Sequence, residues 1–452
     1  MPNHAGRRGV PRRRTLRPRD TERPTVTSPD HTAVDATPDP WAVPLVEASR
    51  SRIPESFAAL RYRDFRLLLG GLFMALSGWW MIIVAQGWLV LEMTDRASAV
   101  ALVSAMLSLP WLILAPFSGV LADRIYRKHL LLTTRLTVAV LMLVEGVLIL
   151  AGLIEFWHMV VLAFLAGSAF AMDIPARQSL IPDTVHVSVV ANAVAINTSV
   201  FSMTTIAGPM VGAGILEWLG PGGCFLANAV GNVCLASAIF LMRIPRRRRV
   251  GRMNFAGDFV GGLTYVRRQP LLMMLLGVSL TLIVTTRSWQ QIAPVFVRDV
   301  WGRGEGSLGV LYMATGIGAV AGAFALLALS RMERRWRVYA VSLAGSVVGV
   351  AAFAYSPTFA LAVACVLFVG FGQQVADTTS QTVILVRTPE ELRGRMMALT
   401  SLLSGLQPLG TMLTGVVADL ASPQLAVGGG ALVAAFGLLV VFTRTRETLR
   451  TF

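Results

Sequence analysis

The stretch GVLADRIYRK, residues 119–128, decides how the rest of the chain is interpreted. It contains the short polar gap between two long apolar runs, 98–121 and 129–152, and it brings one carboxylate and three basic side chains together. Apolar runs of more than about 18 residues are long enough to cross a bilayer as helices. The gap is therefore predicted to be a loop at a membrane surface.

The composition agrees with this interpretation. Of 452 residues, 54% are hydrophobic and only 14% are charged, with a mean hydropathy of +0.63, whereas about a quarter of the residues of a soluble protein are charged. The net charge of +15 is spread over tails and short loops. A nucleic-acid partner would need its basic residues on one face, so we expect a bilayer and not nucleic acid as the partner.

Twelve apolar runs divide the chain. Lipid offers no hydrogen bonds to a polypeptide backbone, so crossing segments must be helices or closed barrels, and runs this long indicate helices. The sequence thus predicts an all-α integral membrane protein. The expected spans are 65–93, 98–121, 129–152, 157–176, 191–217, 222–243, 271–295, 307–329, 338–356, 358–378, 396–419 and 424–443.

The basic residues predict the orientation. Cytoplasmic loops carry an excess of Arg and Lys, and the loops on one side of the predicted membrane hold nearly all of these residues. The opposite loops hold only Arg96, Arg298 and Arg303. We therefore expect a multi-pass protein of the cytoplasmic (cell) membrane with both termini in the cytoplasm.

The two halves of the chain are weakly duplicated. LADRIYRKHL at 121–130 corresponds to LSRMERRWRV at 329–338, and AMDIPARQS at 171–179 corresponds to VADTTSQTV at 375–383. Such a repeat is typical of transporters whose substrate path runs between two bundles. The repeat predicts two six-helix pseudo-repeats, and the polar segments between the apolar runs predict the tails and the linker. The expected regions are a disordered basic cytoplasmic tail at 1–64, a bundle at 65–243, a linker with an amphipathic helix at 244–270, a bundle at 271–443 and a cytoplasmic tail at 444–452.

The loop between spans 2 and 3 resembles a signature of the major facilitator superfamily, although Tyr126 stands where that family usually has glycine. The matching residues are Gly119, Leu121, Ala122, Asp123, Arg124, Arg127 and Lys128. Within the superfamily the chain is similar to the branch of the enterobactin exporter and macrolide efflux pumps. The stretches PARQSLIPDTV (175–185), GLTYVRRQPLL (262–272) and RSWQQIAPVFVRDVWG (287–302) carry this likeness, which implies the twelve-helix fold and outward transport.

The resemblance also implies roles for single residues. Asp123 would interact with the N-terminus of span 11 and stabilise the outward-facing state, which makes the loop a gate. Gly119 would allow close helix approach, while Arg127 and Lys128, next to Arg124, would hold the loop at the anionic inner leaflet. In span 5, Gly208, Pro209 and Gly212 match part of an antiporter motif, but Thr204 replaces a glycine and span 4 lacks the arginine of many proton antiporters.

Polar groups inside spans are costly and usually functional, and five are candidates for the substrate or proton pathway. Arg287 in span 7 could contact the substrate or pair with a carboxylate, and the alternative is a structural ion pair. Glu145 in span 3 could bind a proton, unless it lies at the membrane interface. Asp173 and Asp377 near the inner ends of spans 4 and 10 could instead cap helices or pair with loop arginines, and Gln86 in span 1 is a neutral companion.

Aromatic residues in span 1, among them Trp79, could line a pocket for a bulky apolar substrate or simply pack between helices. We find no nucleophile–base pair, no metal-ligand spacing and no phosphate-binding loop, so we expect no enzyme, no cofactor and no metal. The sequence favours a monomeric secondary transporter that exports a small organic molecule by alternating access, coupled to protons. The alternatives are an importer or uncoupled facilitator, and a non-transporting receptor or assembly factor.

Overall fold

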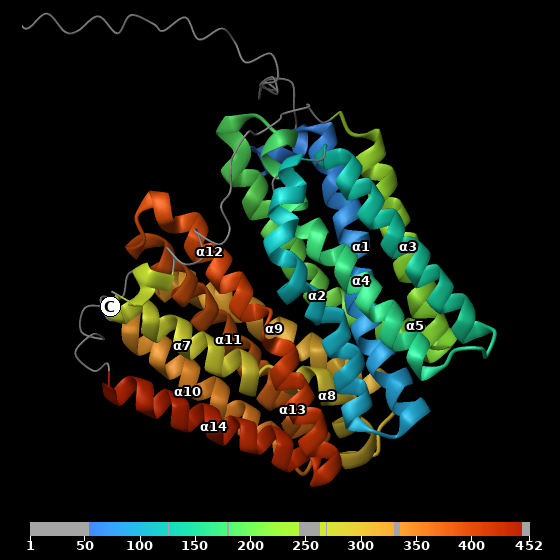
Figure 1. Cartoon of the computed structure of the whole chain (residues 1–452), viewed down its shortest axis with the longest axis vertical. Coiled ribbons are helices and arrows are strands. Elements are labelled where there is room, and N and C mark those ends of the chain that lie inside the picture. Colours follow the sequence, from blue (N-terminus) through green and yellow to red (C-terminus); the bar gives the residue numbers. More distant parts are fainter. Residues whose placement is uncertain are drawn as a thin grey trace, which may run out of the picture. The chain divides into compact units, whose positions relative to one another are not determined.

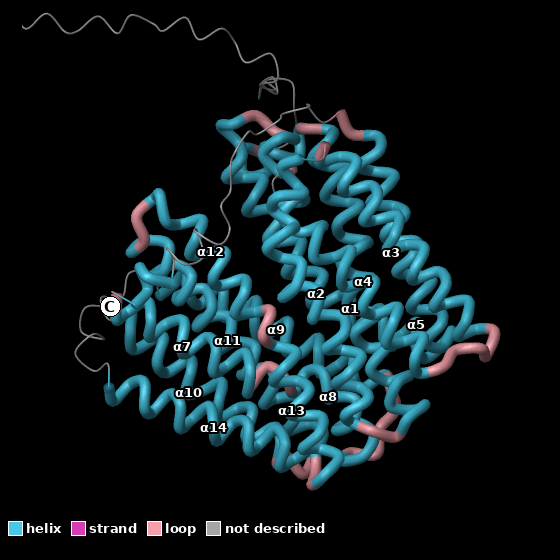
Figure 2. The backbone as a smooth tube through the Cα atoms, in the orientation of Figure 1, coloured by secondary structure: helices cyan, strands magenta, loops and turns pink. Residues whose placement is uncertain are grey.

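The computed structural model describes residues 54–124, 126–178, 180–243, 263–267, 269–329 and 335–444. Within these ranges every regular element is helical (Figures 1 and 2), as the sequence predicts. Eleven segments are long and apolar enough to cross a membrane. One of them, Val187–Leu241, has 55 residues, or about 80 Å of helix, which is enough for two spans. The count therefore agrees with the twelve predicted helices.

The break inside this long segment is local. Gly220 has φ +68° and is followed by Pro221, so the helix stops and restarts between the predicted spans 5 and 6. Glycine adopts this left-handed conformation without the steric cost that other residues have. The elements of the first half are η2 (Glu55–Arg61), α1 (Arg63–Thr94), α2 (Ala97–Arg124), α3 (Arg127–Leu150), α4 (Phe156–Gln178), η3 (Ile181–Thr184), η4 (Val187–Val189) and α5 (Val190–Leu241).

Two predicted spans of the second half are each built from consecutive helices. Span 7 is interrupted around Arg287, and span 11 is interrupted at Gly405 and Leu406. Interrupted helices in membrane proteins commonly line a cavity. The elements are α7 (Pro270–Thr285), α8 (Trp289–Val295), a π-helical turn η5 (Phe296–Val300), α9 (Gly306–Leu329), α10 (Arg335–Ala354), α11 (Phe359–Arg387), α12 (Glu390–Ser404), α13 (Gln407–Leu420) and α14 (Pro423–Arg444).

The helices pack mainly with partners from their own half of the chain. In the first half α1 and α3 lie against α5, and α2 lies against α4. In the second half α11 lies between α9 and α10, and α10 also contacts α14. The halves meet through α2 with α13 and through α5 with α9. We call the end of the helices that carries residues 95, 220 and 421 the outer face, following the predicted orientation.

The folded region begins earlier than predicted. Residues 54–64 were expected to belong to the tail, but the backbone N–H of Ala59 donates to Asn192 Oδ1 (2.9 Å) and Asn192 Nδ2 donates to the carbonyl oxygen of Ser56 (2.7 Å). Ala58 and Ala59 are buried there. This short segment has no apolar periodicity and is held by one asparagine from α5. The rest of the tail, most of the linker including Phe255 and Phe259, and residues 445–452 lie outside the described residues.

Candidate functional site

The basic residues of the predicted gating loop bind the protein itself. Arg127 Nη1 donates to Asp183 Oδ2 at 2.9 Å, and Lys128 Nζ donates to the carbonyl oxygens of Phe240 (2.8 Å) and Met242 (2.7 Å). The ammonium of Lys128 thus satisfies free carbonyls at the end of α5, where a cation is favourable. The contact of these residues with lipid headgroups stays a prediction. The side chains of 115–125, including those of Gly119, Asp123 and Arg124, lie outside the described residues.

A buried ion pair joins α3 and α4. Asp173 accepts hydrogen bonds from Arg135 Nε (2.8 Å) and Nη2, and Arg177 Nε lies 3.5 Å from its Oδ2 atom. Arg135 and Asp173 are 2% and 1% exposed. Arg135 is not among the residues predicted from the sequence. Its position within span 3 is the signal that could have found it, because a charge within a span needs a partner.

The ion pair continues into a chain of amides on α5. Arg135 Nη1 donates to Asn232 Oδ1 at 3.1 Å, and Asn232 Nδ2 donates to both the carbonyl oxygen (3.0 Å) and Oδ1 (2.9 Å) of Asn228. Asn228 is 1% exposed, and its Nδ2 atom has no hydrogen-bond partner among the described residues. A buried donor without a partner costs about 1–3 kcal/mol, so this amide group marks a place where water or ligand can bind.

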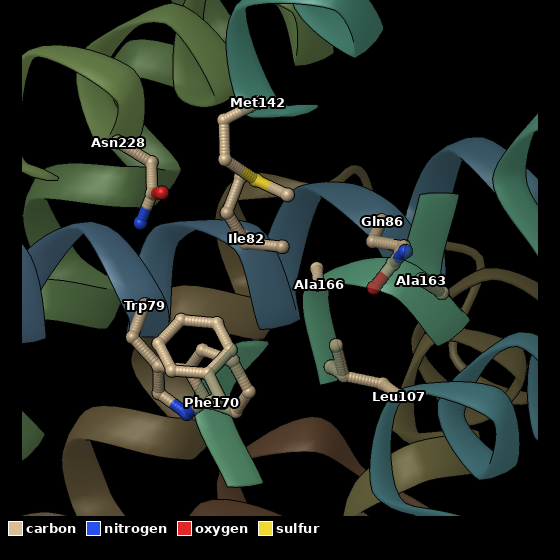
Figure 3. A pocket seen from close by; sticks show the side chains of 9 residues that line it. All are labelled: Trp79, Ile82, Gln86, Leu107, Met142, Ala163, Ala166, Phe170 and Asn228. Carbon is tan, nitrogen blue, oxygen red and sulfur yellow. The ribbon is translucent and has the colours of Figure 1, made fainter. Parts of the chain in front are cut away.

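The amide of Asn228 faces a narrow cavity (Figure 3). The centre of a water molecule can occupy a volume of about 10 Å³ in this cavity. This is enough space for roughly one water molecule. Trp79 and Phe170 form an edge-to-face pair with centroids 4.5 Å apart in its wall. The structure therefore places two of the sequence-predicted residues, Gln86 and Trp79, in one cavity. The lining residues are Trp79, Ile82, Gln86, Leu107, Met142, Ala163, Ala166, Phe170 and Asn228.

Glu145 lies one helical turn beyond Met142 on α3. It is 0% exposed, and neither carboxylate oxygen has a hydrogen-bond partner among the described residues. Arg135, Val138, Met142 and Glu145 follow one buried stripe of this helix, so Glu145 faces the neighbouring helices. An ionised carboxylate without a partner is very costly in such surroundings.

In the second half, the structure brings Arg287 and Asp377 together. Arg287, in the break between α7 and α8, donates through Nη2 to Asp377 Oδ2 of α11. The two side chains keep 33% and 43% of their surface exposed. Asp173 and Asp377 correspond in the duplication, yet one is enclosed and the other is open to its surroundings. Of these two pairs, Arg287–Asp377 is therefore the one that is open to its surroundings.

The glycines of the span 5 motif permit a close helix crossing. A Cβ atom at Gly208 would lie 2.7 Å from the Cβ of Trp80, and one at Gly212 would lie 2.8 Å from the Cα of Met81. The carbonyl oxygen of the intervening Pro209 lies against Gly309 of α9. The motif thus sits where α1, α5 and α9 meet, at a junction between the two halves. No cluster of three or more potential metal ligands occurs within the described ranges.

The helices, their interruptions and their charged pairs define the class of protein to which this chain belongs. Membrane-spanning helices in two sets, with interrupted helices and charged pairs inside the spans, are typical of secondary transporters, and the family model that matches this chain is one of the major facilitator superfamily. More narrowly, the chain belongs to the family described as transmembrane secretion effector, whose family model matches residues 54–450. The family and its curated relatives are transporters and not enzymes.

Two curated relatives are exporters. The multidrug efflux pump Tap of Mycolicibacterium fortuitum is 27% identical over 368 residues, which are 78% of this chain and 89% of Tap. The enterobactin exporter EntS of Escherichia coli is 25% identical over 356 residues, or 74% of this chain and 80% of EntS. A bacterial homologue of the human lysosomal transporter Spinster, 15% identical, has a TM-score of 0.67 and covers 86% of this chain and 97% of its own. This last likeness shows the shared fold.

Proposed function

We propose that the protein exports a small organic molecule across the cell membrane by alternating access, in exchange for protons. Export is supported by the two curated relatives, a multidrug efflux pump and an enterobactin exporter. The observation that carries the coupling is Glu145, a carboxyl group that is enclosed between membrane helices without a partner among the described residues. A group that is neutral when enclosed and ionised when wetted can carry one proton per cycle.

The order of events follows from the conformation. The ion pairs and hydrogen bonds that link the two halves in the described residues lie at the outer face, so we interpret this as the state closed to the outside. Glu145 has its proton in this state. Opening the cavity to the cytoplasm would let the proton leave and the substrate enter, and reopening to the outside would reverse the exchange. Protons moving inward down their gradient would then drive the substrate outward.

The substrate path would run between the half-exposed Arg287–Asp377 pair and the cavity beside Asn228. Trp79 and Phe170 offer an aromatic surface, while Gln86 and Asn228 offer amide groups. Once the cavity widens during the transport cycle, this combination would suit a bulky, mainly apolar molecule with a few hydrogen-bonding groups, because apolar walls supply affinity and sparse polar groups fix orientation. The Arg287–Asp377 pair would add a charged contact on the side of the second half.

The function is tested with the purified protein in proteoliposomes. Ethidium and enterobactin serve as probes, and an imposed proton gradient serves as the driving force. We expect at least one probe to accumulate against its gradient, with a protonophore abolishing accumulation and the internal pH changing in step with transport. Accumulation that survives the protonophore would contradict proton coupling. Transport that only equilibrates the probe would indicate an uncoupled facilitator.

A further inference from the structure

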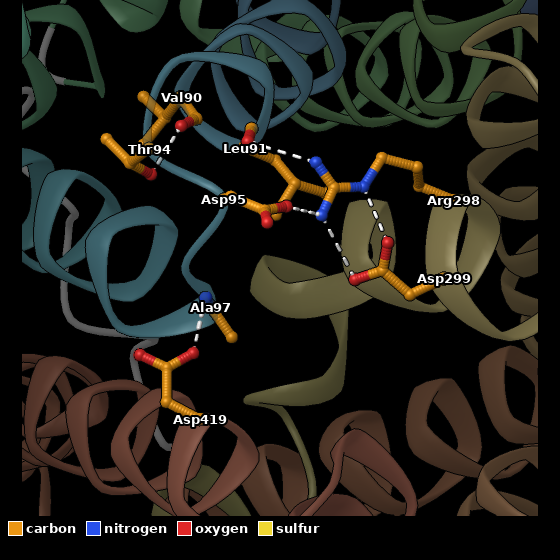
Figure 4. A network of polar contacts seen from close by, with 8 residues as sticks. All are labelled: Val90, Leu91, Thr94, Asp95, Ala97, Arg298, Asp299 and Asp419. Atoms are coloured by element: carbon orange, nitrogen blue, oxygen red, sulfur yellow. Dashed lines mark hydrogen bonds and ion pairs between the residues drawn. The ribbon is translucent and has the colours of Figure 1, made fainter.

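Two charged residues of the second half, Arg298 and Asp419, form hydrogen bonds with the turn between α1 and α2 (Figure 4). Arg298 in η5 donates through Nη1 to the carbonyl oxygen of Leu91 (3.1 Å) and through Nη2 to Asp95 Oδ1. Asp419, at the end of α13, accepts from the backbone N–H groups of Ala97 (2.7 Å) and Ser98 (3.0 Å). The cation therefore binds the last turn of α1 and the carboxylate binds the first turn of α2.

Each charge has the sign that its helix end favours. The C-terminus of a helix carries a partial negative charge and the N-terminus a partial positive charge. The first N–H groups of a helix have no partner within it, and the residue before α2 is Arg96, which has no acceptor to cap them. Asp419 supplies the missing acceptor from the other half of the protein.

Asp419 is badly placed for its own helix, since it lies in the last turn of α13, where a carboxylate opposes the partial charge of the helix end. Its favourable contacts in the structure are with α2. A residue in this position stabilises the contact between the two halves, and it gains little from α13 itself. Arg298 differs in this respect, because it also donates two hydrogen bonds to the neighbouring Asp299 (2.6 and 3.3 Å) and so contacts both its own segment and the end of α1.

The backbones approach closely at this contact. Gly415 lies one turn before Asp419, and a Cβ atom there would lie 3.0 Å from the carbonyl oxygen of Ala97 and 3.1 Å from the Cα of Ser98. The Cβ of Ala101 would be closer still. Any side chain at position 415 would push α13 away from α2, so Gly415 is what lets the carboxylate reach the two N–H groups.

The sequence around Asp419 occurs a second time. Residues 414–419 read TGVVAD at the end of α13, and residues 118–123 read SGVLAD at the end of α2. The helices α2 and α13 pack against each other across the two halves, and they run in opposite directions between the faces. A Gly-x-x-x-Asp sequence therefore ends α2 at the inner face and α13 at the outer face. In this structure the outer aspartate, Asp419, accepts hydrogen bonds from the start of α2.

We propose that Arg298 and Asp419 form a charge–dipole latch that holds the outer face closed, and that the latch must release each time the protein opens to the outside. The inference rests on the alternating access proposed above. Asp95 keeps 81% of its side chain exposed, so water can replace the bonds that break. A latch in reach of water can open and close during the cycle, whereas a fully enclosed ion pair would be too costly to separate.

The test measures the separation of the two halves at the outer face. Spin labels are attached to Leu153→Cys and Leu425→Cys, which are exposed and take no part in the latch, in a protein whose three native cysteines (Cys224, Cys234 and Cys365) are changed to serine and which keeps the melting temperature of the wild type. Pulsed electron spin resonance in proteoliposomes gives the distance distribution. We expect Asp419→Asn to raise the ratio of the long-distance to the short-distance population roughly two- to fivefold, with a further rise when Arg298→Gln is added.

The matched control is Asp299→Asn. It removes a carboxylate from the same network, but its hydrogen bonds to Arg298 stay within one half, so we expect wild-type distances. Gly415→Ala is a second, independent variant, because it separates α2 from α13 without changing charge, and it should shift the distances in the same direction as Asp419→Asn. Distances that are unchanged in both Asp419→Asn and Gly415→Ala would overturn the latch.

The distance measurement requires neither a substrate nor a proton gradient, so its failure can be distinguished from failure of the proposed function. A shifted distribution in Asp419→Asn supports the latch even if no probe is transported. Normal proton-driven transport combined with unshifted distances in the two variants would reject the latch and leave the transport cycle intact.

Discussion

Arg287 and Asp377 form an ion pair across the interruption of the seventh predicted span, and about a third or more of each side chain remains exposed. An exposed pair contributes only about 0.2–1 kcal/mol to stability. Charges inside a membrane protein are otherwise expensive, so a pair that adds so little stability is best explained by work in transport.

We therefore expect Arg287→Gln to abolish transport while leaving the melting temperature of the detergent-solubilised protein almost unchanged. The physical reason is that the substrate loses its charged contact, whereas the fold loses a weak interaction. Transport of the probes in proteoliposomes and a thermal melt measure the two effects. Arg267→Gln, which removes an exposed arginine at the edge of the linker, is the control and should transport normally. Efflux within about twofold of wild type in Arg287→Gln would refute this role.

The corresponding pair of the first half should behave in the opposite way. Arg135→Gln leaves the enclosed Asp173 with only Arg177 nearby, and loss of one partner of a buried pair costs about 3–5 kcal/mol. We expect a large fall in melting temperature and in the yield of folded protein. The double variant Arg135→Leu with Asp173→Leu should recover part of the loss, because apolar side chains replace the buried pair, while Arg177 loses its carboxylate partner. Arg177→Gln, which removes the more distant arginine, should have a smaller effect.

Glu145→Gln imitates the protonated carboxyl group and cannot ionise. We expect it to exchange probe molecules across the membrane but to lose accumulation driven by a proton gradient. Its transport rate should also lack the dependence on internal pH that we expect of the wild-type protein. Glu155→Gln is the matched control, since Glu155 is exposed in the α3–α4 connection that follows the same helix. If the Glu145→Gln variant still concentrates the probe, the proton is carried elsewhere.

Trp79→Ala should change which compounds are transported. Removing the indole group opens the wall opposite Phe170, so the narrow cavity beside Asn228 would accept larger groups and bind small aromatic probes less tightly. We expect the apparent KM for ethidium to rise several-fold, while bulkier dyes lose less or gain. Trp157→Ala removes an exposed tryptophan near the start of α4 and should leave the profile unchanged. An identical profile in both variants would place the substrate outside this cavity.

The sequence predicted the spans well because a membrane requires long apolar segments, and this signal is local. The interruption at Gly220 was also visible, since a glycine–proline pair separates two such segments. The hydrogen-bond partners of the charged side chains could not be predicted from such a local signal. Arg298 was interpreted as a loop charge next to Asp299, yet it binds Leu91 and Asp95, about two hundred residues away in the chain.

Two further differences have physical causes. Arg135 was hidden because a single arginine barely changes the hydropathy of a long run, even though its charge requires Asp173 on the next helix. The segment 54–64 was assigned to the tail because one short helical turn has no apolar periodicity. Asn192, which binds this segment, lies at the start of α5. Nothing in the sequence indicates that its side chain forms hydrogen bonds with the backbone of residues 56 and 59.

Lys128 is the only lysine of the chain, and two carbonyl oxygens at the end of α5 hold its ammonium group. An amine held by two carbonyl oxygens reacts slowly with acylating reagents, because these hydrogen bonds must break before the nitrogen can attack the reagent. Apart from the N-terminus, Lys128 is thus the single site for amine-directed reagents. It is also the last residue of the stretch that matches the superfamily signature. The rate at which a reagent modifies Lys128 is consequently a built-in reporter of how often α3 separates from α5, readable by mass spectrometry without introducing any label.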